Sequence, residues 1–79
     1  MIKELDVVAL TRDLPEQGLV AGDLGTVVFD YEASDPGPAY EVEFVALDGK
    51  TLALLTLPAD AVRPIRPREI PHARPVASA

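Results

Sequence analysis

Apolar and polar residues alternate along short stretches of this chain, and turns that contain Gly or Pro separate the stretches. In the cleanest example, Tyr40, Val42 and Phe44 alternate with Glu41 and Glu43. Successive side chains of a strand point to opposite faces of its sheet, so the apolar residues are predicted to face the core and the glutamates to face solvent. The pattern predicts an all-β protein.

A second alternating strand is predicted over residues 26–32, where the odd positions are apolar. These positions are Val27, Phe29 and Tyr31. We expect them to face the core, and Asp30 and Glu32 to face solvent. The chain then reverses over residues 33–38, a cluster of Pro, Gly, Ser and Asp, before the strand that starts at Tyr40.

This turn sets the predicted pairing of the two strands. If Tyr31 lies opposite Tyr40, then Asp30 lies opposite Glu41. Carboxylates that face each other destabilise a sheet by up to about 1 kcal/mol. We therefore expect a basic group between them, supplied by tail arginines or by a cationic partner protein; the alternative is a solvated acidic face that aids solubility.

Two further strands are predicted over residues 5–12 and 62–65, with a single 3-10 turn over residues 58–61. Both faces of the first strand carry apolar residues. We expect Val8 and Leu10 to point inward.

The first connection, residues 13–22, is long enough to be a binding loop, although its length also suits a simple connector. Leu14 and Leu19 are its apolar residues beside Pro and Gly, and we expect them to tuck under the barrel.

The strand predicted over residues 50–57 is apolar on both faces. Its apolar residues are Leu52, Ala53, Leu54, Leu55 and Leu57. Each exposed leucine forgoes about 1.5–3 kcal/mol of burial, so this strand is predicted to be central or to be covered by a second copy of the chain. We expect self-association.

Two glycine-containing turns connect the strands. Gly22, Asp23 and Gly25 form a sharp turn, in which a glycine is needed either because φ is positive or because a side chain cannot be tolerated. Asp48 and Gly49 are the favoured pair of a two-residue type I′ hairpin, in which both residues have positive φ.

Composition predicts one domain, residues 1–65, and a flexible, extended Pro/Arg-rich tail, residues 66–79. The 79 residues include no cysteine, which excludes disulfides and thiolate metal sites. Residues 1–65 hold twelve acidic and four basic residues, a net charge of −8, whereas the tail holds three arginines and one glutamate, a net charge of +2. A body this acidic repels phosphate, so we do not expect the barrel to bind nucleic acid.

The inventory of reactive side chains does not predict an enzyme. His72 is the single histidine, and the two serines are Ser34, in a turn, and Ser78, at the end of the chain. We expect no catalytic residue, no cofactor and no metal site.

No apolar run approaches the roughly 20 residues of a membrane span, and the N-terminus has no signal-peptide core, so we expect a soluble, cytoplasmic protein with no membrane partner.

Five sequence segments together resemble a known family. The segments are Leu5-Asp6, Arg12-Asp13-Leu14-Pro15, Gly22-Asp23-x-Gly25-Thr26-Val27-Val28, Tyr40-Glu41-Val42-Glu43-Phe44 and Asp48-Gly49-x-Thr51. They are similar to a family of small bacterial domains of unknown function placed among SH3-like barrels, over about residues 3–65. Some members stand beside small partner genes in toxin–antitoxin-like arrangements, so the resemblance implies a protein-binding role.

The glycine turn by itself also occurs in the barrels of nitrile hydratase β-subunit-like proteins and of KOW domains. The interpretation is therefore a small five-stranded SH3-like barrel that acts as a non-enzymatic protein-interaction module, the small partner of a toxin–antitoxin-like or enzyme pair. The alternatives are a nucleic-acid-associated KOW-like barrel and an accessory subunit of a larger enzyme. The predicted partner-binding residues are Asp30, Glu32, Glu41, Glu43, Leu55 and Leu57.

Overall fold

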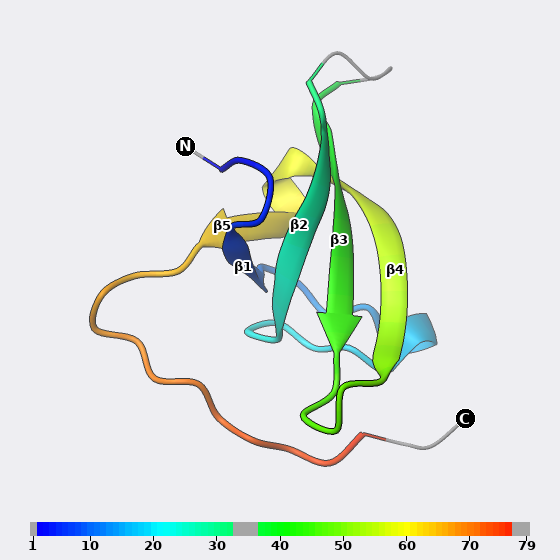
Figure 1. Ribbon diagram of the computed structural model, residues 1–79, viewed down its shortest axis with the longest axis vertical. Helices are drawn as coiled ribbons and strands as arrows, with labels where there is room; N and C mark the ends of the chain where they lie inside the picture. The colour runs from blue at the N-terminus through cyan, green and yellow to red at the C-terminus, as the bar shows by residue number, and fades with distance from the viewer. Residues whose placement is uncertain (1, 33–36, 77–79) are drawn as a thin grey trace.

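The computed structural model describes residues 2–32 and 37–76, which form five strands and two short 3-10 helices (Figure 1). The strands are β1 (Val7–Leu10), β2 (Leu24–Tyr31), β3 (Ala39–Val45), β4 (Thr51–Pro58) and β5 (Val62–Pro64), and the helices are η1 (Pro15–Gln17) and η2 (Ala59–Ala61). All neighbouring strands are antiparallel, in the order β4-β3-β2-β1-β5. The predicted five-stranded all-β class is confirmed, including the 3-10 turn before the last strand.

The sheet curves into a barrel-like shape but does not close, because β4 and β5 share no ladder within the described residues. The orange and red tail leaves β5 and passes beneath the β3–β4 hairpin (Figure 1). The division into residues 1–65 and 66–79 remains a prediction. No helix in the described part of the chain has the length and hydropathy to cross a membrane.

The core lies inside the curve of the sheet. Its buried residues are Val8, Leu10, Leu19, Val27, Val42, Phe44, Leu57, Ala61 and Val62. The predicted inward positions of Val8, Leu10, Val42 and Phe44 are confirmed. Leu14 packs against this core, and two backbone hydrogen bonds between Leu14 and Leu19 close the loop around η1, so the predicted anchors of this loop are also confirmed.

The inward orientation predicted for all three odd positions of β2 is right only for Val27. The β2–β3 register shifts between Val27 and Phe29, which makes Val28 an inserted, bulged residue. A bulge reverses the alternation of faces beyond it. As a result Phe29 and Tyr31 are 48% and 37% exposed instead of buried.

The bulge also changes the cross-strand pairs. Asp30 lies opposite Tyr40, and Glu41 lies between Phe29 on β2 and Thr56 on β4. The predicted opposition of Asp30 to Glu41 is therefore wrong. The carboxylate of Glu41 has an aromatic neighbour instead of another acid.

The β3–β4 hairpin is not the predicted two-residue type I′ turn. Ala46 accepts a hydrogen bond from the N–H of Gly49 and donates one to the carbonyl of Lys50, so the loop is longer than two residues. Gly49 has a φ of 91°, whereas Asp48 is not among the described residues with positive φ. Asp48 instead accepts a hydrogen bond from the N–H of Lys50. A register shift after Phe44 accounts for the longer loop.

The central position considered for β4 is wrong, since this strand lies at the edge of the sheet. Leu55 and Leu57 lie opposite Val42 and Tyr40 and face inward. Leu54 lies opposite Glu43 and is 55% exposed. Coverage of the exposed leucines by a second copy remains a prediction.

The two glycines of the β1–β2 turn meet different requirements. Gly22 has a φ of 94°, whereas Gly25 does not have a positive φ, so the other of the two predicted reasons, a side chain that cannot be tolerated, applies to Gly25. Gly25 is buried, and a Cβ placed there would lie 2.6 Å from Val42 Cγ1 and 2.8 Å from Phe44 Cε2. Gly25 is required because β2 packs closely on core side chains of β3.

Replacing Gly25 by valine should lower the free energy of unfolding by about 1–3 kcal/mol or more, because the side chain would force Val42 and Phe44 out of position. Urea denaturation followed by circular dichroism measures this effect. Gly37→Ala is the control, since a Cβ there would meet no neighbouring atom within 4 Å. Equal stability of Gly25→Val and the wild type would contradict the close packing.

Candidate functional site

One exposed surface lies on the convex side of β2, β3 and β4 and combines aromatic, aliphatic and acidic side chains. We call it the outer face; its residues are Phe29, Tyr31, Glu41, Glu43, Leu54 and Thr56. The ring centroids of Phe29 and Tyr31 lie 4.7 Å apart, with their planes inclined at 60°. The aromatic pair and Leu54 thus present apolar surface beside two carboxylates.

The carboxylates of the outer face are held by neutral donors. Glu41 accepts hydrogen bonds from Thr56 Oγ1 at 2.5 Å and from the Tyr31 hydroxyl at 3.4 Å. Glu43 accepts one from Thr51 Oγ1 at 2.7 Å. These hydroxyl groups orient the carboxylates without neutralising their charge.

The ion pairs of the described residues lie elsewhere on the molecule. They are Arg12–Asp60, Arg63–Glu69 and Arg74–Asp23. Within residues 2–32 and 37–76, therefore, no cation of this chain forms an ion pair with Glu41 or Glu43. Both negative charges remain available to a cationic group from outside.

The other predicted partner-binding residues are placed differently. Asp30 is half-buried opposite Tyr40, and Glu32 is exposed just past the end of β2. Leu57 is only 7% exposed and Leu55 faces the core, so Leu54 is the leucine that β4 presents on the outer face.

Sequence reasoning missed Phe29 and Tyr31 as surface residues because it assumed uninterrupted alternation along β2. The available signal was Val28, an apolar residue at a position that strict alternation makes polar. A bulge accounts for that residue, but a strand that is apolar on both faces would account for it as well.

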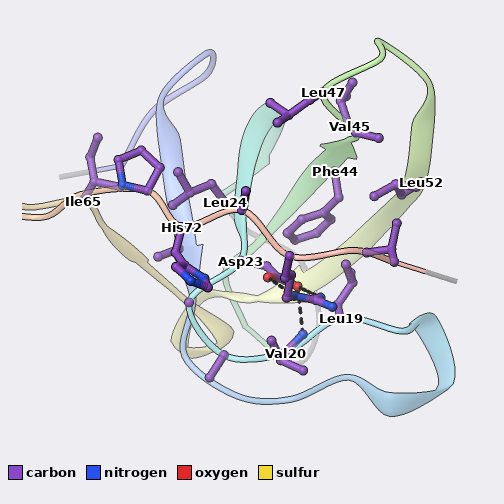
Figure 2. Close-up of a pocket in the computed structure, with 18 of the residues that line it drawn as sticks. Leu19, Val20, Asp23, Leu24, Phe44, Val45, Leu47, Leu52, Ile65 and His72 are labelled. Carbon is purple, nitrogen blue, oxygen red and sulfur yellow. Dashed lines mark hydrogen bonds and ion pairs between the residues drawn. The ribbon is translucent and has the colours of Figure 1, made fainter.

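A second candidate region lies between the barrel and the C-terminal tail. The tail crosses between Val45, Leu47 and Leu52 on one side and Leu19 and Val20 on the other (Figure 2). The space between them is open to solvent and has a volume of about 1040 Å³. We call it the tail groove; its main apolar residues are Leu24, Val45, Leu47, Leu52, Ile65 and Ile70.

The near end of the tail is anchored by Glu69. Arg63 donates two hydrogen bonds to the two oxygens of this carboxylate, at 2.9 and 2.5 Å, and the N–H of Arg66 donates a third at 2.7 Å. The bonds from Arg63 and then that from Arg66 lower the pKa of Glu69 to about 2. Glu69 therefore stays ionised over the whole physiological range.

The far end of the tail is anchored by Arg74. Its Nε donates to Asp23 Oδ1 at 3.0 Å, and one terminal nitrogen donates to Asp23 Oδ2 and to the carbonyl of Gly18, the latter at 3.1 Å. The N–H of Val20 also donates to Asp23, at 2.9 Å. Burial alone would raise the pKa of Asp23, but the hydrogen bonds from Arg74 and Val20 outweigh it and leave this pKa below its ordinary value.

The sequence predicted that a tail arginine or a cationic partner would lie between the opposed acids of β2 and β3, but the structure places the tail arginine elsewhere. Arg74 does reach back to the barrel, but it binds Asp23, in the turn before β2. From the sequence, Asp23 was expected to have only a structural role in that turn. The outer face and the tail groove are two separate sites: in the described part of the chain, the acids of the outer face have no paired cation, whereas Asp23 is paired with Arg74.

The sequence comparison identifies the family. The family model described as a domain of unknown function, DUF4926, matches residues 4–64. The chain belongs to the DUF4926 family. The match contains the whole outer face and Asp23, whereas the tail beyond residue 64 lies outside it. No curated protein and no solved structure matches the chain.

The Glu69 anchor has a predictable dependence on pH. Its pKa is lowered from an ordinary 4.5 to about 2, so the ion pair should be complete above pH 4.5 and be lost as the pH falls through about 2. The amide chemical shift of Arg66, which reports the hydrogen bond to Glu69, should follow this titration in NMR spectra.

Glu69→Gln is the matched control, because it keeps an oxygen acceptor and loses the titrating group. Its Arg66 amide shift should show no transition near pH 2. A midpoint near 4.5 in the wild type would mean that Arg63 does not bind Glu69 in solution.

Proposed function

We propose that this DUF4926 protein is a non-enzymatic interaction module that binds a cationic protein partner through its outer face. The observation that supports the proposal is the exposed pair of Phe29 and Tyr31 beside Glu41 and Glu43, two carboxylates with no ion pair inside the described chain. Exposed aromatic groups beside acids suit an arginine or lysine of a partner.

The chemistry of recognition follows from the arrangement of the face. A guanidinium group binds a carboxylate with two hydrogen bonds and also stacks on an aromatic ring, so one arginine can contact Glu41 and Phe29 together. The aliphatic stem of that side chain then packs against Leu54. The net charge of −6 adds a long-range attraction for a cationic partner.

The proposal extends to the kind of pair that this protein forms. A small acidic module that covers a basic surface fits the role of the small partner in a toxin–antitoxin-like or enzyme pair, in the cytoplasm. A nucleic-acid role has less support, because Arg63 and Arg74 are already bound to carboxylates of this chain.

Affinity capture from the native cells with matched variants tests the proposal. A partner retained by the wild type should bind the Glu41→Gln/Glu43→Gln variant and the Phe29→Ala variant at least about tenfold more weakly, because each removes a charged or aromatic contact. The control is Glu4→Gln/Glu16→Gln, which removes the same charge from exposed positions outside the face.

Partners that bind all four proteins equally would contradict the proposal. A partner lost to the same extent with the control variant would show general attraction to negative charge and would also contradict a specific outer face. Circular dichroism and thermal melting confirm that each variant is folded.

A second copy of the chain is a further candidate partner, favoured by the edge strand β4. This strand carries eight residues without a charged side chain, so its edge lacks the charges that usually discourage pairing with another strand. Leu52 and Leu54 add exposed apolar surface. We therefore propose that two copies pair through β4.

Sedimentation equilibrium should show reversible dimers at high concentration, and Leu54→Glu should shift the protein to the monomer. Leu47→Glu is the control, since Leu47 is a leucine 98% exposed on the hairpin rather than on β4. A wild type that remains monomeric at millimolar concentration would contradict pairing through this edge.

A further inference from the structure

We infer that the tail groove is a second interaction site, which binds an extended protein segment carrying an arginine next to a large apolar residue. The tail of this chain occupies the arginine-binding part of the site and leaves the apolar part open. This inference does not depend on the outer face.

The arginine-binding part is formed by Asp23 and the carbonyl of Gly18. Together they offer three oxygen atoms to one guanidinium group, and Arg74 bonds to all three. With Arg74 bound, the Asp23 side chain is only 20% exposed even though it carries a charge. Such a carboxylate needs a cationic partner, and the planar fork of arginine fits two carboxylate oxygens better than a lysine does.

Backbone hydrogen bonds hold these acceptors in place without help from the tail. The N–H of Asp23 donates to the carbonyl of Val20, and the N–H of Val20 returns a bond to the Asp23 side chain. Gly18 is held by a bond from its N–H to the carbonyl of Pro15. The acceptors are therefore preorganised and should keep their positions when Arg74 leaves.

The apolar part of the groove is poorly filled. Leu24, Val45, Leu47 and Leu52 line it and are all exposed (Figure 2). The tail lines the groove beside Arg74 with Ala73, Pro75 and Val76, which leave these four residues at least 40% exposed. The large tail residue Ile70 is 88% exposed. With the tail in place, the groove has a volume of about 1040 Å³.

The occupant that suits both parts is a segment of another protein. Charge complementarity to Asp23 requires an arginine, and the open apolar part requires a leucine or similar side chain where the tail has Ala73. The chain's own tail has the advantage of a high effective concentration, so it excludes weak ligands. Only a segment that also fills the apolar part displaces it.

Peptide binding to the full-length chain tests the inference by fluorescence anisotropy. The probes are two labelled peptides with the sequence of residues 70–76, one unchanged and one with the substitution Ala73→Leu. The Arg74→Ala chain, whose acceptors are free, should bind the leucine peptide at least about tenfold more tightly than the unchanged one. The wild-type chain should bind the leucine peptide at least about tenfold more weakly than the Arg74→Ala chain does, because its own tail competes for the site.

Three control variants show whether the peptide binds at Asp23 or elsewhere on the chain. Arg68→Ala removes a tail arginine that has no ion pair in the described chain, and this protein should exclude the peptide as the wild type does. Adding Asp23→Asn to Arg74→Ala should abolish binding, because the amide keeps an acceptor for Val20 but loses the charge. Adding Glu41→Gln to Arg74→Ala instead should leave the affinity for the leucine peptide unchanged, which distinguishes this site from the outer face.

Four results would overturn the inference. They are the absence of binding at about 1 mM peptide, equal affinity for the two peptides, equal affinity of the wild type and Arg74→Ala, and binding that survives Asp23→Asn. Of these, equal affinity for the two peptides would point instead to exchange of tails between copies of this chain.

Discussion

The pairing of β2 with β3 determines what this protein exposes. At one end of the ladder, Gly25 lets Val42 and Phe44 pack against the backbone of β2. Beyond it, the inserted Val28 reverses the face of the sheet to which each following side chain of β2 points. With continuous alternation Phe29 and Tyr31 would lie in the core, and Glu41 would have no aromatic neighbour. A single inserted residue therefore creates the outer face.

The distribution of charge separates the two candidate sites. Asp23 and Glu69 are bound by arginines, which lowers the pKa of each below its ordinary value. Glu41 and Glu43 are instead oriented by threonine hydroxyls, which leave their charge in place. The first pair of acids holds the tail on the barrel, and the second pair leaves a negative surface open to another protein.

The tail differs from the remainder of the chain in how it is held. The barrel is stabilised by burial of aliphatic and aromatic side chains, whereas the described part of the tail is attached through two arginine–carboxylate pairs. Both pairs are partly open to solvent, and such pairs contribute less free energy than burial in a core and are weakened by salt. An attachment of this kind can be released without unfolding the barrel, which is what a competing ligand requires.

The sequence alone determined the features that depend on neighbouring residues. Strict alternation placed Val42 and Phe44 in the core, and Leu14 and Leu19 were recognised as anchors of the first loop. The resemblance of short segments to a known family also sufficed to predict the fold class, which the structure confirms.

Only the tertiary structure decided the features that depend on contacts between distant segments. Sequence showed that Gly25 was needed, but the reason, its contact with Val42 and Phe44, appears only when β3 lies beside it. The bulge at Val28 arises from the register of two strands and leaves no distinct pattern in one of them. Arg74 and Asp23 are 51 positions apart, and no local preference pairs them. The fold was predictable because it rests on periodicity, whereas both candidate sites rest on which strands and loops the fold brings together.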